Sequence, residues 1–172
     1  PQLVGDAKFV GVEKPEISRA YYGELIGEPA VYKFEMSEKF NLYVGLLVPD
    51  APGAETGIKV QIYRYHEHIA TLDGGEHRWT KTYDPFCGNR FLKGPEYRAE
   101  ARRGKYEIFV LNSGNRGKYV LAIGERGEWS KAKIRSSLAA LPALKRDFFG
   151  APSWTAFLGL AGLGLAVVVL VV

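Results

Sequence analysis

Three histidines form the first group of side chains that could bind a metal ion. His66 and His68 make an H-x-H motif, and His77 follows nine residues later. Alternate residues of a strand share one face, so His66 and His68 can reach the same ion, with His77 as a third ligand. Three imidazoles suit Zn or Cu. The alternative is that these histidines border a turn before Asp73 and are simply solvated.

Side chains that carry oxygen ligands form a second group, on a stretch rich in Gly and Pro. They are Asp73, Glu76, Asp84 and Asn89, with Glu96 beyond them. Ca²⁺ prefers oxygen ligands of this kind. Their spacing matches no fixed calcium-binding loop, so ordinary turn formation is the alternative. We expect no cofactor, with calcium or a His-bound transition metal as the alternatives.

Cys87 is the only cysteine of the chain, so no intrachain disulfide can form. A lone thiol can be a nucleophile, but a small buried residue is the more usual role. The sequence lacks G-x-S-x-G, a phosphate loop, a dinucleotide fingerprint and H-E-x-x-H. We therefore expect a protein that is not an enzyme. A set of aromatic residues could stack on sugar rings or fill the second face of a sheet: Tyr21, Tyr43, Tyr63, Tyr65 and Trp79.

Strands must position these groups, because apolar and polar residues alternate along much of the chain. Alternation of this kind marks a strand with one buried face. Strands are expected at 8–12, 17–22, 32–36, 40–48, 58–63, 106–110 and 119–123. Residues 73–100 show little pattern and are expected to be loops around a short strand near 77–83. The whole predicts a mainly β fold, an antiparallel β-sandwich or jelly-roll-like head over residues 1–128.

The strand starts carry a family resemblance. Gly-Lys-Tyr occurs twice, at 104–106 and 117–119, and Gly23-Glu24-Leu25 and a Tyr-Lys-Phe-Glu run at 32–35 lie upstream. Over residues 20–125 this succession resembles the pre-peptidase C-terminal domain, a small jelly-roll-like β-sandwich appended to secreted proteases and other surface proteins. The chain departs from that pattern around Cys87, where an insertion is needed. The resemblance implies an extracytoplasmic binding or accessory module and transfers no catalytic residue.

The net charge of +4 lies in one short segment. Residues 1–130 hold 18 basic and 18 acidic residues, whereas residues 131–147 hold five basic residues and one acidic residue. A neutral head argues against a nucleic-acid partner, which requires a basic face on the folded domain. The basic segment suits anionic lipid headgroups, with a solubilising collar as the alternative.

Residues 129–153 are predicted to be a basic amphipathic stalk next to a membrane. A helix is expected over 129–141, with Ile134, Leu138 and Leu141 on one apolar stripe, and Pro142 bends or ends it. Aromatic residues beside charges are typical of a membrane interface. The expected interface residues are Lys145, Arg146, Phe148, Phe149 and Trp154.

Residues 154–172 carry no charge and would reach roughly 28 Å as a helix, enough to cross a bilayer. We expect one C-terminal transmembrane helix here. Thr155, Gly159, Gly162 and Ala166 would share one side of it. A face of small residues lets a partner helix approach closely. Chance is the alternative, because Gly and Ala are common in membrane helices.

These features predict a single-pass membrane protein with an extracytoplasmic head, in the periplasm or at the cell surface. The basic cluster alone would place the head in the cytoplasm. The chain begins with Pro1, which fits either a cleaved signal peptide or a fragment boundary. The expected role is an accessory or structural subunit that docks on integral membrane protein subunits and contacts the lipid bilayer. The alternative is a cell-surface module for glycan or calcium, and an enzyme ranks third.

Overall fold

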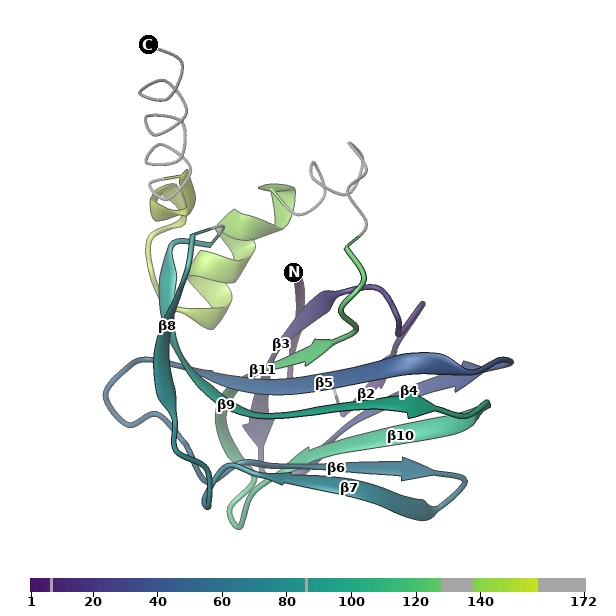
Figure 1. Cartoon of the computed structure of the whole chain (residues 1–172). Coiled ribbons are helices and arrows are strands. Elements are labelled where there is room, and N and C mark those ends of the chain that lie inside the picture. Colours follow the sequence, from purple (N-terminus) through teal and green to yellow (C-terminus); the bar gives the residue numbers. More distant parts are fainter. Residues whose placement is uncertain (7, 86, 128–137, 158–172) are drawn as a thin grey trace.

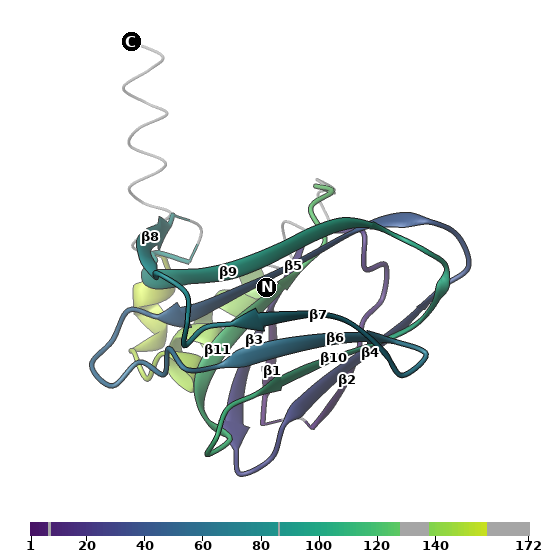
Figure 2. The ribbon, with the colours of Figure 1, turned by 60° about the horizontal axis from the view of Figure 1, so that its bottom comes forward.

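The computed structural model describes every residue of the chain except 7, 86, 128–137 and 158–172. Its strands form two facing sheets, as Figures 1 and 2 show. The six-stranded sheet has the order β1-β3-β11-β5-β9-β8, and the five-stranded sheet has the order β2-β4-β10-β6-β7. The strands are β1 (Gln2–Gly5), β2 (Phe9–Gly11), β3 (Arg19–Ile26), β4 (Ala30–Met36), β5 (Phe40–Pro49), β6 (Lys59–Arg64), β7 (Glu67–Asp73), β8 (Thr80–Asp84), β9 (Asn89–Ala101), β10 (Gly104–Leu111) and β11 (Arg116–Ile123). The predicted mainly β, sandwich-like head is confirmed.

Both sheets are mixed, which corrects the prediction of an antiparallel sandwich at one edge of each sheet. β1 runs parallel to β3, and β2 runs parallel to β4. The other neighbouring strands of the two described sheets are antiparallel. Parallel neighbours cannot be joined by a tight hairpin. A longer connection joins β1 to β3. It contains β2, which belongs to the other sheet.

Alternate side chains of the central strands fill the space between the sheets. Two tyrosines from opposite sheets meet there, with the hydroxyls of Tyr32 and Tyr119 2.9 Å apart. The Tyr119 ring lies against Gly23, where a Cβ atom would come within 2.5 Å of the Tyr119 hydroxyl. Since Gly23 has no side chain, the ring of Tyr119 can occupy that space.

Residues 73–100, predicted to be loops around a short strand near 77–83, contain β8 close to the predicted strand and also most of β9, the longest described strand at 13 residues. A bulge around Gly94 interrupts the pairing of β9 with β5. Before the bulge Leu92 packs on the core, and beyond it Tyr97 and Ala101 do so. The extra residue moves the inward positions from even to odd numbers. A fixed period of two therefore fails to detect this strand.

Short helical pieces follow the sandwich. Residues 138–143 are α-helical, the π-helical turn η1 (Leu144–Phe148) continues them, and the 3₁₀ helix η2 (Ser153–Phe157) comes next. Among the residues that the structure describes, no helix is long and apolar enough to cross a membrane. Most of the predicted transmembrane span lies outside these residues, as do Gly159, Gly162 and Ala166. Thr155 is described, and its hydroxyl donates to the Pro152 carbonyl at 2.6 Å.

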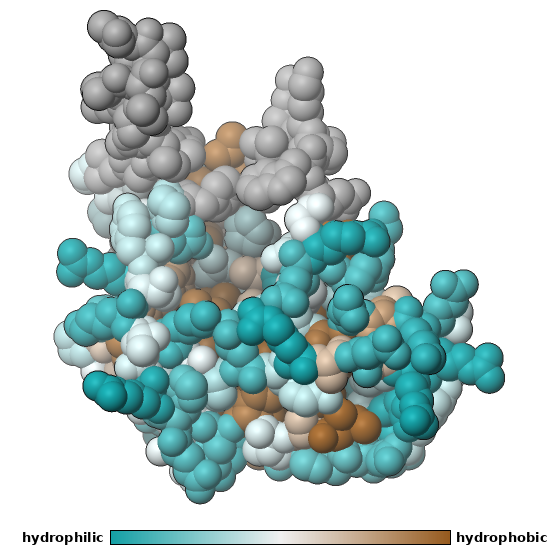
Figure 3. All heavy atoms as spheres, viewed as in Figure 1, coloured by the Kyte–Doolittle hydropathy of each residue, from teal (hydrophilic) through white to brown (hydrophobic). Residues whose placement is uncertain are grey.

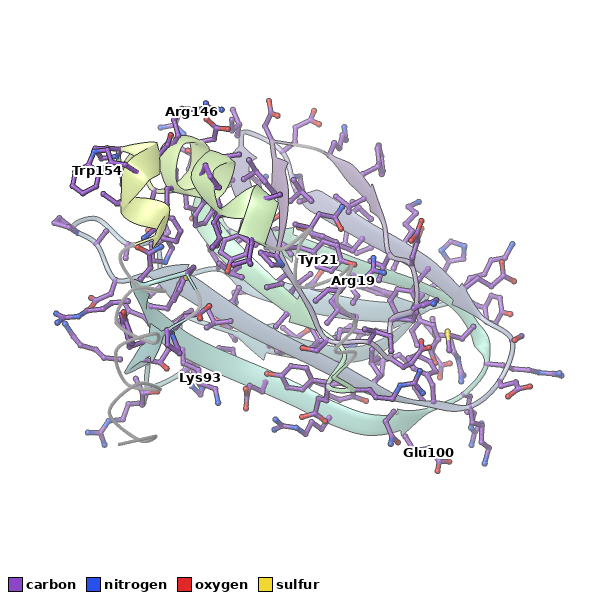
Figure 4. All side chains as sticks on the ribbon, turned by 90° about the horizontal axis from the view of Figure 1, so that it is seen from above. Arg19, Tyr21, Lys93, Glu100, Arg146 and Trp154 are labelled. Carbon is purple, nitrogen blue, oxygen red and sulfur yellow. The ribbon has the colours of Figure 1, made fainter. Side chains whose placement is uncertain are left out.

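The C-terminal segment, defined as residues 138–149, packs on the outer face of the six-stranded sheet (Figures 1 and 4). The Tyr22 ring meets the Phe148 ring edge to face, with centroids 5.2 Å apart. The apolar stripe was predicted through Ile134, Leu138 and Leu141, of which Ile134 lies outside the described residues. The partner of Leu138 and Leu141 is the protein's own sheet. The buried residues of this second cluster are Tyr22, Cys87, Phe91, Val120, Leu141, Leu144 and Phe148.

This packing changes the expected membrane-interface role of several residues. Phe148 is 2% exposed and Lys145 is 4% exposed, so the fold itself covers both side chains. Phe149 is half-buried against the same cluster. Arg146 and Trp154 are exposed, and both lie at the rim of the molecule in the view of Figure 4. Of the five predicted interface residues, these two remain the ones available to a lipid surface.

Candidate binding face

The structure separates the three histidines predicted to share a metal ion. His66 lies in the turn between β6 and β7 with a φ of 69°. His68 lies on β7 and shares a 2.8 Å hydrogen bond with the Thr71 hydroxyl. His77 stands instead against the Trp79 ring. The described part of the chain contains no group of three His, Cys, Asp or Glu side chains that could hold a metal ion.

The predicted calcium ligands are also spread over different contacts. Asp73 pairs with Lys59 at 2.5 Å, and this contact lowers the pKa of the Asp73 carboxyl. Glu76 is exposed in the loop after β7. Asp84 and Asn89 face each other across the β8–β9 pair. The Asn89 side-chain oxygen accepts a hydrogen bond from the Lys145 ammonium group at 2.9 Å. This oxygen is therefore already bound to a positive group of the protein.

Cys87 belongs to a buried polar cluster between the β8–β9 turn and the C-terminal segment. It is 1% exposed, and burial raises the pKa of its thiol to about 12. Lys145 enters the cluster from the C-terminal segment, and burial lowers the pKa of its ammonium group. The Asn89 side-chain nitrogen is buried there without a hydrogen-bond partner among the described residues. A buried protonated thiol is a poor nucleophile, so this cluster does not resemble a thiol active site.

The five aromatic residues predicted to stack on sugars do not share one surface. Tyr21 is buried in the core, and Trp79 packs against that core. Tyr43 lies on the six-stranded sheet under the guanidinium of Arg98. Tyr65 is exposed at the β6–β7 turn. Tyr63 lies on the outer face of the five-stranded sheet, where other apolar side chains join it.

Three apolar residues cross that outer face in one line. The strand register places Phe9 of β2 beside Val31 of β4, and Val31 beside Phe109 of β10. Phe9 is 62% exposed, whereas Val31 is 5% exposed although it points away from the core. Neighbours in register on one face of a sheet contact one another, so Phe9 and Phe109 flank Val31 and help to cover it.

Tyr63 of β6 lies diagonally from Phe109, next to this line, because the strand register places Gln61 beside Phe109 and Glu107 beside Tyr63. Its ring packs edge to face on the Phe109 ring at 5.6 Å and on the His68 ring at 5.3 Å, measured between centroids. Its hydroxyl donates a long hydrogen bond of 3.5 Å to the Gln61 side-chain oxygen. We call Phe9, Val31, Phe109 and Tyr63 the apolar row. His68, predicted as a metal ligand, therefore lies at the end of an aromatic surface.

Ion pairs flank the apolar row on the same face. The Lys33 ammonium lies 2.7 Å from the Glu107 carboxylate and 5.4 Å from the centroid of the Phe9 ring. Lys59 and Asp73 form a second pair across β6 and β7. Opposite charges on neighbouring strands stabilise a sheet and cancel each other. The surface around the apolar row is therefore close to neutral.

Sequence reasoning found Tyr63 but missed the other members of the apolar row. Val31 and Phe109 occupy outward positions, where period-two alternation would place polar residues. The sequence shows that both residues are apolar at positions expected to face solvent. This pattern indicates a contact surface on the outer side of the sheet.

A groove of about 520 Å³ lies elsewhere, between the β4–β5 turn and the residues after β11. Met36 and Phe40 contribute apolar surface to it, and charged and neutral polar residues line the rest. Glu16 is 3.6 Å from Arg126, and Glu125 is 2.6 Å from the Arg98 guanidinium. Because much of its charge is already paired within the protein, this groove is a weaker candidate than the apolar row.

Comparison with known proteins gave similar structures only. No family model matches the sequence, and no curated protein matches it. The chain is similar to the pre-peptidase C-terminal domain of collagenase from Bacillus anthracis, at 19% identity and a TM-score of 0.40, with 72% of this chain and 95% of that chain covered. This is the family that the sequence resembles.

Two larger proteins also contain a similar region. They are the catalytic domain of a GH87 alpha-1,3-glucanase in complex with nigerose and a beta-glucosidase from Paenibacillus barengoltzii. Both are 13% identical over 71% of this chain, with TM-scores of 0.29 and 0.30. The match spans 27% of the first protein and 13% of the second.

Proposed function

We propose that this chain is a non-enzymatic binding module, held at a membrane by residues 154–172, that presents its five-stranded sheet to an extracytoplasmic partner. The main support for this proposal is the apolar row. Phe9 in this row is 62% exposed, and ion pairs border the row on the same sheet face. Contiguous apolar groups on an exposed face mark contact sites. The high pKa of the Cys87 thiol supports a role without catalysis.

The position of the C-terminal segment supports this arrangement. It packs on the six-stranded sheet, so the described chain leaves the head from that side (Figure 1). The outer face of the five-stranded sheet points the opposite way. A membrane reached from η2 would leave the apolar row open to a partner. The surface seen in Figure 3 is mostly hydrophilic, with small separate hydrophobic areas, as expected for a head that stands in water.

The accessory-subunit role belongs to the same proposal. Thr155, Gly159, Gly162 and Ala166 would pack against helices of integral membrane subunits, so the chain would join a membrane complex through its anchor and leave the outer face of the five-stranded sheet open. A Gly162→Leu variant places a bulky side chain on this face and should reduce recovery of the complex in gentle detergent. Recovery equal to that of the unaltered chain would overturn the helix-packing role.

Membrane attachment and binding are tested separately with the full chain in native membranes. Alkaline extraction should release a chain that ends at Phe157 but retain the full chain, and equal release would overturn the anchor. A photo-crosslinking residue at position 109 should form adducts, whereas one at position 83 on β8 should not. Tyr83 is a suitable control because it is 55% exposed and lies on the other sheet. Absence of adducts at position 109 would overturn the binding role of this face.

A further inference from the structure

We infer that the apolar row and its polar border form a binding site for a neutral glycan. The inference rests on the proposed binding role and names the ligand class of the same face. Three properties of that face suit a neutral glycan: the spacing of its apolar side chains, the hydrogen-bonding groups beside them, and the pairing of its charges.

The apolar row extends over four strands, with buried Val31 between the ring of Phe9 and the rings of Phe109 and Tyr63. It runs across β2, β4, β10 and β6, which are consecutive in the sheet. Neighbouring strands lie about 4.8 Å apart, so three steps cover about 14 Å. Phe109 and Tyr63 hold each other edge to face near one end, and Phe9 is exposed at the other. A pyranose ring has an apolar C–H face, and aromatic side chains offer a rigid apolar surface that matches it.

Neutral hydrogen-bonding groups lie directly beside the apolar row. Gln61 stands in register between Phe109 and Thr71. Thr71 and His68 hydrogen-bond to each other, and the Tyr63 hydroxyl reaches Gln61. Amide, hydroxyl and imidazole groups can donate and accept hydrogen bonds, as sugar hydroxyls require. Binding sites typically combine an apolar lining with a few polar groups that fix orientation.

The pairing of charges on this face favours a glycan over a protein partner. Stable protein interfaces are depleted of charged residues at their centre. Here Glu107 lies in register beside Tyr63 and its partner Lys33 reaches the Phe9 ring, so a flat protein partner that covered both rings would bury this pair. Burying an ion pair carries a desolvation cost that its attraction often fails to offset. A narrow, hydrated ligand can contact the rings and leave the pair in water.

The same pairing favours a neutral glycan over a charged one. A sulfated or uronic acid chain would have to compete with Glu107 and Asp73 for the lysines that they already hold. The lysine closest to the apolar row is also engaged by the Phe9 ring at 5.4 Å. A ligand without charge leaves these contacts intact.

The test measures binding of the full chain in lipid nanodiscs to neutral gluco- and chito-oligosaccharides by saturation-transfer NMR and titration calorimetry. Heparin and polygalacturonate fragments serve as charged probes. The variants are Tyr63→Leu and Phe109→Leu, with Tyr83→Leu as the matched control on the other sheet. Thermal melting of each variant confirms that it folds. We expect a neutral probe to bind, with about tenfold weaker affinity in the two row variants and unchanged affinity in the control.

Each other outcome overturns the inference. If no neutral probe binds at millimolar concentration, or if only charged probes bind, the ligand class is wrong. If a neutral probe binds equally well to Tyr63→Leu and Phe109→Leu, the site lies elsewhere. Should position 109 still crosslink to a protein in native membranes while no glycan binds, the proposed binding role stands and the glycan assignment fails. The two failures are therefore distinguishable.

Discussion

Leu144→Ala should destabilise the head, because the C-terminal segment is an integral part of the folded structure. Leu144 is 1% exposed and lies in the cluster with Tyr22, Phe91 and Val120 of the six-stranded sheet. Burying a Leu side chain contributes about 1.5–3 kcal/mol, and the cavity left by Ala adds to the loss. The total is limited by the free energy with which the segment docks, so we expect about 2–3 kcal/mol. For a chain of this size the melting temperature should fall by about 4–12 °C.

The assay is thermal unfolding of the full chain in detergent, followed by near-ultraviolet circular dichroism. Ile26→Ala is the matched control, since Ile26 is 63% exposed and its truncation should change stability by less than about 0.5 kcal/mol. A Leu144→Ala variant that melts together with Ile26→Ala would refute the reasoning. It would mean that the segment does not stabilise the head, as expected for the juxtamembrane stalk that the sequence alone predicts.

Three further changes probe the core and the buried polar cluster. Gly23→Ala should lower the free energy of unfolding, measured in urea, by about 1–3 kcal/mol, because the new Cβ atom would meet the Tyr119 ring. Gly11→Ala is the control and should have little effect, since the space around Gly11 is open. Equal effects of the two changes would contradict this packing. Tyr32→Phe should lower the free energy of unfolding by about 1–3 kcal/mol, because the Tyr119 hydroxyl stays buried without its partner. Adding Tyr119→Phe should recover part of that loss in a double-mutant cycle. If the effects of the two changes simply add, the hydrogen bond does not contribute to stability. Burial lowers the pKa of Lys145 in the folded state, so the unfolded chain binds more protons between the folded and unfolded pKa values. The free energy of unfolding should therefore rise with pH through this window, which lies below 10.5, the ordinary pKa of a lysine. Lys145→Met should remove this part of the pH dependence. If the pH profile of the variant is unchanged, another group causes the dependence.

The sequence predicted the central strands well because each presents one clean apolar face to the core. β5 is the best example, with Leu42, Val44 and Leu46 all buried on the inward side. β9 was missed because the bulge at Gly94 reverses which positions point inward. Pattern recognition over a fixed period cannot follow a strand whose phase changes halfway.

The C-terminal segment shows a different limit of sequence reasoning. An apolar stripe through Leu138 and Leu141 predicts that one side of a helix must be covered, but it does not identify the covering surface. Aromatic residues next to Lys145 and Arg146 fitted a membrane interface equally well. The structure places Phe148 against Tyr22 instead. The contact depends on a sheet that forms from residues far apart in the chain, so no local pattern reveals it.

The candidate site could be predicted only in part for a related reason. Tyr63 was identified as a sugar-stacking candidate, whereas Phe9, Val31 and Phe109 come from three strands that are neighbours in the sheet but not consecutive in the sequence. The His and carboxylate groups drew attention because their types suit metals. Their positions depend on turns and ion pairs, such as the Asp73–Lys59 contact, that spacing alone does not determine.

A partner that covers the outer face of the five-stranded sheet should shield its side chains from solvent. Hydroxyl-radical footprinting measures this shielding, by comparing side-chain oxidation of the full chain in native membranes with that of the purified chain in detergent. Phe9, at 62% exposure, should be protected in the membranes, together with Tyr63 and Phe109, while Tyr83, at 55% exposure on the other sheet, should be oxidised equally in both samples. Equal oxidation of Phe9 in the two samples, or protection of Tyr83 in its place, would contradict the proposed binding role of this face.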